Sequence, residues 1–171
     1  DSLWGVWNDK TQEDTSRLKA MKSIAWDGYL FSQPDSAFYF AQMAYDFAEA
    51  RNNKKGMVNA LHAQGVSLKI QGNYENALKY SLKSLAISKE IVDKEAMSAS
   101  FINIGNILDK QGNYEKALEY FLKSLAINKE LGDKEGMAAF LAEIFLSVRS
   151  KILAPSVTAL IAFLHNLSTA F

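Results

Sequence analysis

The feature that most constrains the fold of this chain is an internal repeat with an offset of 40 residues. The segment 71–97 realigns on the segment 111–137, and 20 of the 27 paired positions are identical. The same offset of 40 residues relates Ala37 to Ala77, so at least three copies of one unit are present. A unit of this size cannot bury its apolar side chains alone. The repeat therefore predicts a stack of units in which each packs on its neighbours.

Each unit predicts two helices separated by a short break. Apolar residues recur at helical spacing in Phe101, Ile104 and Leu108. In the break that follows, Gly112 can adopt the positive φ that closes a helix, and Asn113 is a good N-cap for the next one. We expect helices over 13–30, 35–51, 56–71, 74–91, 95–111, 114–131, 135–150 and 155–168.

These helices predict an all-α fold, a right-handed superhelix of antiparallel helix pairs (an α-α solenoid) with about eight helices. The expected divisions are an N-terminal arm over 1–12, helix pairs over 13–54, 55–94 and 95–134, and a degenerate fourth pair over 135–171 that acts as a C-terminal cap. The arm contains Trp4 and Trp7, which must cover apolar surface. It either caps the first helix pair or docks into a groove of another molecule.

The C-terminal segment carries no formally charged residue from Ile152 to Phe171, where His165 alone can become charged. Such a segment can pack on the preceding pair, form a homodimer contact through 141–171, or enter a membrane. Its Pro155 and its several Ser, Thr and Asn residues argue against a membrane span.

Composition and motifs argue against several classes of function. The 19 basic and 19 acidic side chains cancel, so bulk charge would not recruit nucleic acid. The chain has no cysteine, and its two histidines are not at metal-ligand spacing. The serines at 81, 84 and 124 lie on the apolar side of helices as small residues, where a nucleophile would lack a base. We expect no enzyme activity, no metal and no cofactor.

The alternation of large and small residues resembles the tetratricopeptide repeat over residues 12–140. The positions that carry the resemblance are Phe101, Ile104, Gly105, Leu108, Ala117, Phe121 and Ser124. Lysine replaces the usual closing proline at 89 and 129, which resembles the long-repeat variety of kinesin light chains and Leu-Gly-Asn-repeat scaffolds. The N-terminal part resembles segments that precede helical repeats in bacterial nucleotide cyclases and histidine kinases.

The resemblance implies that the first helix of each pair lines a concave groove that binds a protein or an extended peptide. The implied partner-binding residues are Lys19, Lys22, Trp26 and Tyr29 in the first unit, Asn59, His62, Val66 and Lys69 in the second, and Asn103, Asn106, Asp109 and Lys110 in the third. Asparagine amides can pair with a peptide backbone. For Asn103, ordinary hydrophilic surface or bonding between helices is an equal alternative.

We therefore expect a peptide-binding scaffold with a protein partner. Two alternatives stay open from the sequence: a sensory or assembly segment of a larger bacterial signalling protein, and a structural module that self-associates through its apolar C-terminal helix. The sequence leaves the compartment undetermined. It leans towards a bacterial exported or membrane-associated context and leaves the cytoplasm open.

Overall fold

The computed structural model describes residues 2–133. This part of the chain is helical throughout, with short connections and no strand. The elements are α1 (Leu3–Asn8), α2 (Asp14–Ser23), the π-helical turn η1 (Ile24–Tyr29), α3 (Pro34–Glu49), α4 (Lys54–Ile70), α5 (Tyr74–Glu90), α6 (Lys94–Lys110) and α7 (Tyr114–Leu131). The expected all-α fold is confirmed, and α3 to α7 begin and end within two residues of the predicted bounds. The expected helices 135–150 and 155–168, the cap over 135–171 and the dimer contact over 141–171 lie outside the described residues.

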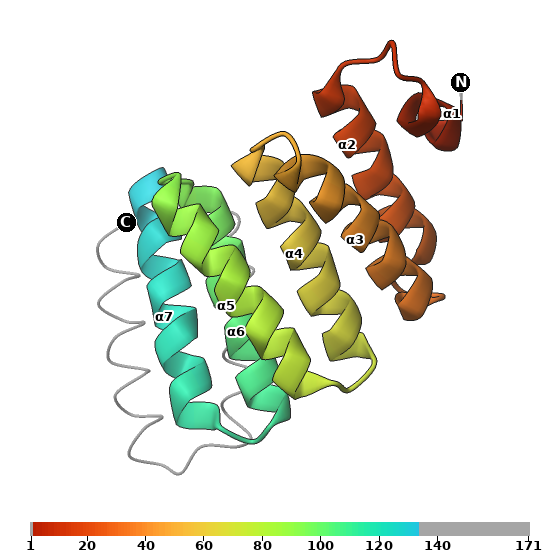
Figure 1. Cartoon of the computed structure of the whole chain (residues 1–171). Helices are drawn as coiled ribbons and strands as arrows, with labels where there is room; N and C mark the ends of the chain where they lie inside the picture. The colour runs from red at the N-terminus through yellow and green to blue at the C-terminus, as the bar shows by residue number, and fades with distance from the viewer. Residues whose placement is uncertain (1, 134–171) are drawn as a thin grey trace.

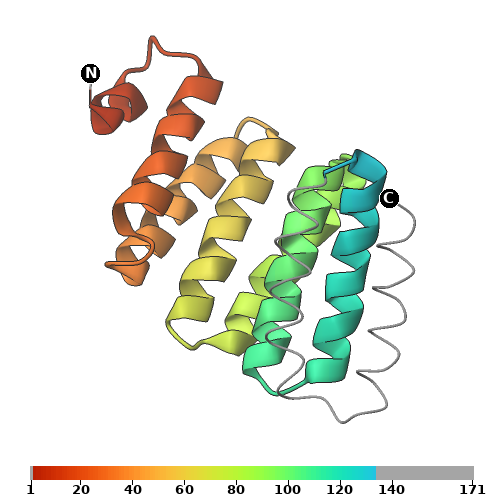
Figure 2. The same cartoon turned by 180° about the vertical axis from the view of Figure 1, so that it is seen from behind.

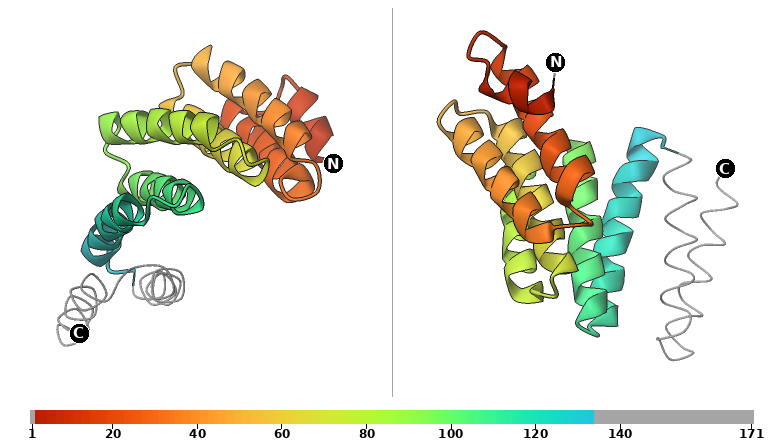
Figure 3. Two further views of the ribbon diagram at one scale, coloured as in Figure 1. Left: turned by 90° about the horizontal axis from the view of Figure 1, so that it is seen from below. Right: turned by 90° about the vertical axis from the view of Figure 1, so that its right-hand side faces the viewer.

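The helices form a stack of antiparallel pairs (Figures 1 and 2). The helix α2 with η1 pairs with α3, α4 with α5, and α6 with α7, and each pair also contacts the next. Seen from below, the stack follows a curved path from the N-terminal to the C-terminal pair (Figure 3). The core is correspondingly divided into several apolar clusters between neighbouring helices. Stability of such a stack comes from contacts between adjacent units. None of the helices within residues 2–133 has the length and apolar character needed to cross a membrane.

Polar caps and left-handed residues set the helix ends. The side chains of Asn53 and Asp93 accept hydrogen bonds from the backbone N–H groups of Gly56 and Ala96, at 2.8 and 2.9 Å. Gly112 has the predicted positive φ, of 78°. Asn113 occupies the predicted N-cap position of α7, but its side chain makes no capping hydrogen bond.

The two most similar units pack differently at one equivalent position. A Cβ added to Gly105 would lie 2.4 Å from the ring of Phe121, so the glycine lets α6 and α7 approach closely. At the equivalent place in the preceding unit, Gly65 lies opposite Ser81, which is smaller than phenylalanine. The Ser81 hydroxyl accepts a hydrogen bond of 3.0 Å from the buried amide of Asn103. Asn103 therefore forms a hydrogen bond between two helices, α6 and α5, which is one of the alternatives that the sequence left open.

The N-terminal arm is partly helical, which the sequence did not predict. Within it, Trp7 is buried and its ring lies 4.9 Å from that of Phe47 on α3. Arg17 of α2 donates a hydrogen bond of 2.9 Å to the Trp7 carbonyl and lies over the Phe47 ring at 4.4 Å. The arm thus covers part of the first helix pair in this structure.

The predicted continuous helix over 13–30 is interrupted. The α-helix ends at Ser23, and the next turn, Ile24–Tyr29, is π-helical. The apolar spacing of this segment fits an α-helix, and the π turn has no signal of its own in that spacing.

Candidate functional site

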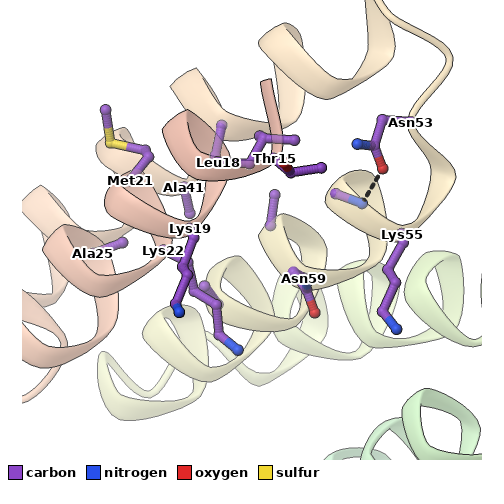
Figure 4. A pocket seen from close by; sticks show the side chains of 14 residues that line it. Thr15, Leu18, Lys19, Met21, Lys22, Ala25, Ala41, Asn53, Lys55 and Asn59 are labelled. Carbon is purple, nitrogen blue, oxygen red and sulfur yellow. Dashed lines mark hydrogen bonds between the residues drawn. The ribbon is translucent and has the colours of Figure 1, made fainter. Parts of the chain in front are cut away.

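A cleft of about 380 Å³ lies between α2 and α4, with α3 beneath it (Figure 4). Its walls include six small residues: Ala25, Ala41, Ala44, Gly56, Ala60 and Ala63. At the position of Ala41 the third unit carries Phe121, a much larger side chain, whereas alanine leaves this space open in the first unit. The hollow is therefore a direct consequence of the small residues of the first two pairs, and its size is that of a small-ligand or side-chain pocket.

The mouth of this cleft is polar and basic. Lys19 and Lys22 of α2 and Lys55 and Asn59 of α4 all line it, and their side chains project in a common direction (Figure 4). Lys55 lies 3.8 Å from a carboxylate oxygen of Asp93. Within residues 2–133, no carboxylate lies within 4.0 Å of Lys19 or Lys22. These two ammonium groups are therefore available to an incoming anion.

The charge of this region is separated between two neighbouring helices. The helix α4 carries Lys54, Lys55 and Lys69 and no carboxylate. The helix α3 carries only acidic charges, Asp35, Asp46 and Glu49, all of them exposed. The chain is neutral overall, but the wall of the cleft is cationic.

An aromatic pair adjoins the cationic mouth. The rings of Trp26 on η1 and His62 on α4 lie 5.4 Å apart. Burial, together with the positive charges of Lys69 and Lys22, lowers the pKa of His62 from 6.5 to about 4. Near neutral pH the imidazole is uncharged and can offer one donor and one acceptor. Lys22, Trp26, His62 and Lys69, all expected from the sequence, are thus neighbours.

The other predicted residues are distributed more widely. Val66 is 8% exposed and packs with Leu30 and Ala37 in the core. Tyr29 contacts the Phe40 ring at 5.0 Å and lines a different pocket. The third-unit positions Asn106, Asp109 and Lys110 lie on α6 and are not part of the cleft wall, whereas Asn103 is buried as described above.

Sequence reasoning missed Lys55, Asn53 and Thr15, which complete the mouth. Lys55 precedes the groove positions taken over from the repeat family, so the resemblance did not point to it. The signal available in the sequence was the run of small residues Gly56, Ala60 and Ala63 along one face of a helix.

The buried serines serve helix packing. Ser81 donates a hydrogen bond of 2.8 Å to the Ala77 carbonyl, and the Ser84 and Ser100 hydroxyls lie 3.2 Å apart. Ser124 similarly contacts Ser98 at 2.7 Å. Within the described part of the chain, no group of three or more His, Cys, Asp or Glu residues could hold a metal ion.

Comparisons with known proteins agree with this architecture. The tetratricopeptide repeat model matches residues 56–130. The crystal structure of the TPR domain of Arabidopsis FLU superposes with a TM-score of 0.60 at 25% identity, covering 71% of this chain and 99% of that one. Aspartyl phosphate phosphatase F from Bacillus subtilis superposes with a TM-score of 0.74 at 23% identity, covering 98% of this chain and 43% of that one.

The likeness to the phosphatase shows the fold alone, because the identity is low and the chain spans less than half of that protein. No curated protein sequence matches the chain significantly. The family match and the likeness to the FLU domain both cover helix pairs with the packing described above. Residues 56–130 therefore match the tetratricopeptide repeat family, and the described helices resemble solved tetratricopeptide structures in their fold.

Proposed function

We propose that the cleft between α2 and α4 binds an extended acidic segment of a partner protein. Tetratricopeptide repeats are in general scaffolds for protein interaction. The proposal adds a location and a partner chemistry to that general role. The observation that carries it is the combination of an apolar hollow of about 380 Å³ with a mouth formed by Lys19, Lys22 and Lys55.

Charge complementarity favours an acidic partner. Lys19 and Lys22 have no carboxylate within 4.0 Å in the described residues, and α4 has no acidic side chain along its length. Like charges placed against each other across an interface are strongly unfavourable, so a basic segment would be rejected here. Carboxylates of a partner would be steered to the mouth and held there.

The apolar wall favours an aliphatic side chain between the acidic residues. Ala41 and Ala44 of α3 and Ala60 of α4 give a smooth surface at the base of the cleft. A leucine or methionine side chain inserted there would be removed from water, which stabilises a complex by about 2 kcal/mol. The Asn59 amide at the mouth can pair with the backbone of such a segment.

Binding of short fluorescent peptides, measured by anisotropy, tests the proposal. The peptides should differ in acidic content and in whether a central leucine is present. We expect the acidic, leucine-containing peptide to bind best and to lose affinity with added salt. The double variant Lys19→Glu/Lys22→Glu should weaken binding at least about tenfold, because it reverses two charges at the mouth. The variant Asn59→Trp should also weaken binding by blocking the mouth.

The matched control is Lys79→Glu/Lys116→Glu, which makes the same charge change at exposed positions on α5 and α7. It should change the affinity by less than about twofold, because neither residue lines the cleft and interactions between exposed charges weaken with distance and salt. An equal loss of affinity in both double variants would mean that peptide binding depends on net charge alone and not on the cleft, and would contradict the proposal. Preferential binding of basic peptides would refute the proposal.

A further inference from the structure

A second pocket lies along a different face of α2 and η1 and shares no lining residue with the cleft. It has a volume of about 540 Å³. Its aromatic walls come from three elements: Trp4 of α1, Tyr29 of η1 and Phe40 of α3. Ser23 and Asp27 supply polar groups in the same lining. Docking of the N-terminal arm on the first pair thus creates a pocket that the repeats alone would not have.

The three aromatic rings border the hollow at angles to one another. The Trp4 and Phe40 rings are 5.9 Å apart with an interplanar angle of 70°. The Tyr29 and Phe40 rings are 5.0 Å apart at 43°. Trp4 remains 46% exposed, so its ring is only partly used in folding. Aromatic faces carry a negative electrostatic potential and attract cations that come within about 6 Å.

Asp27 gives the pocket a negative charge. No lining residue is basic. Within residues 2–133, no Lys, Arg or His nitrogen lies within 4.0 Å of the Asp27 carboxylate. A purely apolar ligand would leave this carboxylate unused, and an anionic ligand would be repelled by it. A compact cation with an apolar surface is complementary to both the rings and the carboxylate.

The backbone of this pocket is also unusual. Asp27 and Tyr29 both lie in the π-helical turn Ile24–Tyr29, where the α-helical hydrogen-bond pattern is replaced. Single π-helical turns inside α-helices occur frequently at functional sites. The turn changes the directions of the side chains that follow Ser23, and it is this altered segment that supplies the carboxylate and one aromatic wall.

We propose that this aromatic pocket binds a small alkylammonium cation of the size of choline, with Asp27 as its counter-ion. Such a site is independent of the peptide cleft, because the two hollows have no lining residue in common. A cation surrounded by aromatic rings and one carboxylate, but open to solvent on one side, should bind with a dissociation constant on the order of millimolar.

Titration of the full chain with choline chloride, followed through the indole N–H signals by NMR, tests the proposal. The chain has three tryptophans, and only Trp4 lines the pocket. We expect a saturable shift of the Trp4 signal and much smaller shifts for Trp7 and Trp26. Neohexyl alcohol, the isostere in which carbon replaces the ammonium nitrogen, should bind at least about tenfold more weakly, since it lacks the charge.

The variant Asp27→Asn should weaken choline binding by about tenfold while leaving the fold intact, because the side chain is exposed and nearly isosteric. Asp46→Asn, an equivalent change on the exposed side of α3, should leave the affinity unchanged. Equal binding of choline and neohexyl alcohol would overturn the proposal. So would an Asp27→Asn variant with unchanged affinity, or no saturable Trp4 shift up to roughly 100 mM choline.

Discussion

The first and third helix pairs solve the same packing problem with different side chains. In the third pair, α6 and α7 are held by large residues such as Ile104 and Phe121, and the glycine at 105 accommodates the phenylalanine ring. In the first pair, the corresponding interior contains Ala25 and Ala41, with aromatic rings at its edges and a π turn. Both pockets described above involve the first pair. Regular repeats fill their own interior, so hollows form where the repeat departs from its pattern.

Of the changes that test this difference in packing, Gly105→Ala should have the largest effect on stability. The new methyl group would lie 2.4 Å from the buried ring of Phe121, and α6 also packs against α5 of the preceding pair. We expect a loss of about 2 kcal/mol in the free energy of unfolding, after allowance for the better helix propensity of alanine. Urea denaturation followed by circular dichroism measures it.

The control for this change is Gly28→Ala in the first pair, where an added Cβ meets no atom within 4 Å. It should leave the urea midpoint unchanged or raise it slightly. A loss at position 28 as large as that at position 105 would remove the proposed contrast between a filled and a loosely packed pair.

Acidification should destabilise the region around the cleft. The folded-state pKa of His62 is about 4, below its ordinary value of 6.5. Between these two pH values the unfolded chain binds a proton at His62 and the folded chain does not. The free energy of unfolding is therefore unaffected by His62 above pH 6.5 and decreases as the pH falls from 6.5 towards 4. From pH 7 to pH 5 we expect the free energy of unfolding to fall by about 1–2 kcal/mol from this residue. His62→Gln should lack that part of the pH dependence, and parallel pH profiles for the two proteins would exclude His62 as its source.

Val92→Gly should stabilise the chain. Residues 52, 92 and 132 occupy the same position in successive units, and all have a positive φ, of 51°, 55° and 71°. Glycine is found at 132, whereas Val92 is β-branched and 72% exposed, so its side chain buries little area to offset the strain. Relief of that strain exceeds the entropy cost of glycine by about 0.5–1 kcal/mol. A lower thermal midpoint for Val92→Gly would show that contacts of the valine side chain stabilise the fold by more than its backbone strain costs.

Lys94→Gln should have the smallest effect. Lys94 is 2.7 Å from Glu130, and Lys54 pairs with Glu90 at the equivalent place one unit earlier. In the first pair the charges are exchanged, with Asp14 on α2 at 2.8 Å from Arg51. Exposed pairs of this kind contribute about 0.5 kcal/mol or less. A loss above about 1 kcal/mol in urea denaturation at low salt would mean that the repeated ion pair is a true determinant of the stack.

The regular part of the fold was predictable because each side-chain position recurs. The 40-residue offset placed α4 to α7 correctly, and Gly112 signalled a helix end. The helical arm and the π turn were not predictable in this way, since neither has a counterpart in the other units. The spacing rules assume ideal α-helix throughout, and they fail at Ile24–Tyr29.

The candidate site was only partly accessible from sequence for a related reason. The positions of Lys19, Lys22 and Asn59 were implied by the resemblance to the repeat family. The depth of the cleft depends instead on how little of the space between two helices their side chains fill. It can be predicted only when the relative positions of the two helices are known. Asn103 shows the same limit, because its partner Ser81 replaces the phenylalanine of the next unit and belongs to a different helix pair.

The opposite charges of α3 and α4 have a consequence for a chain whose net charge is zero. In the first two helix pairs these charges form a local electric dipole, with acidic groups on the exposed side of α3 and basic groups at the mouth of the cleft. A charged partner would exert a torque on it, which turns the cationic side towards an acidic surface before contact. Encounter would then be fast and oriented at low ionic strength, and the advantage would fade within a Debye length of about 8 Å at physiological salt.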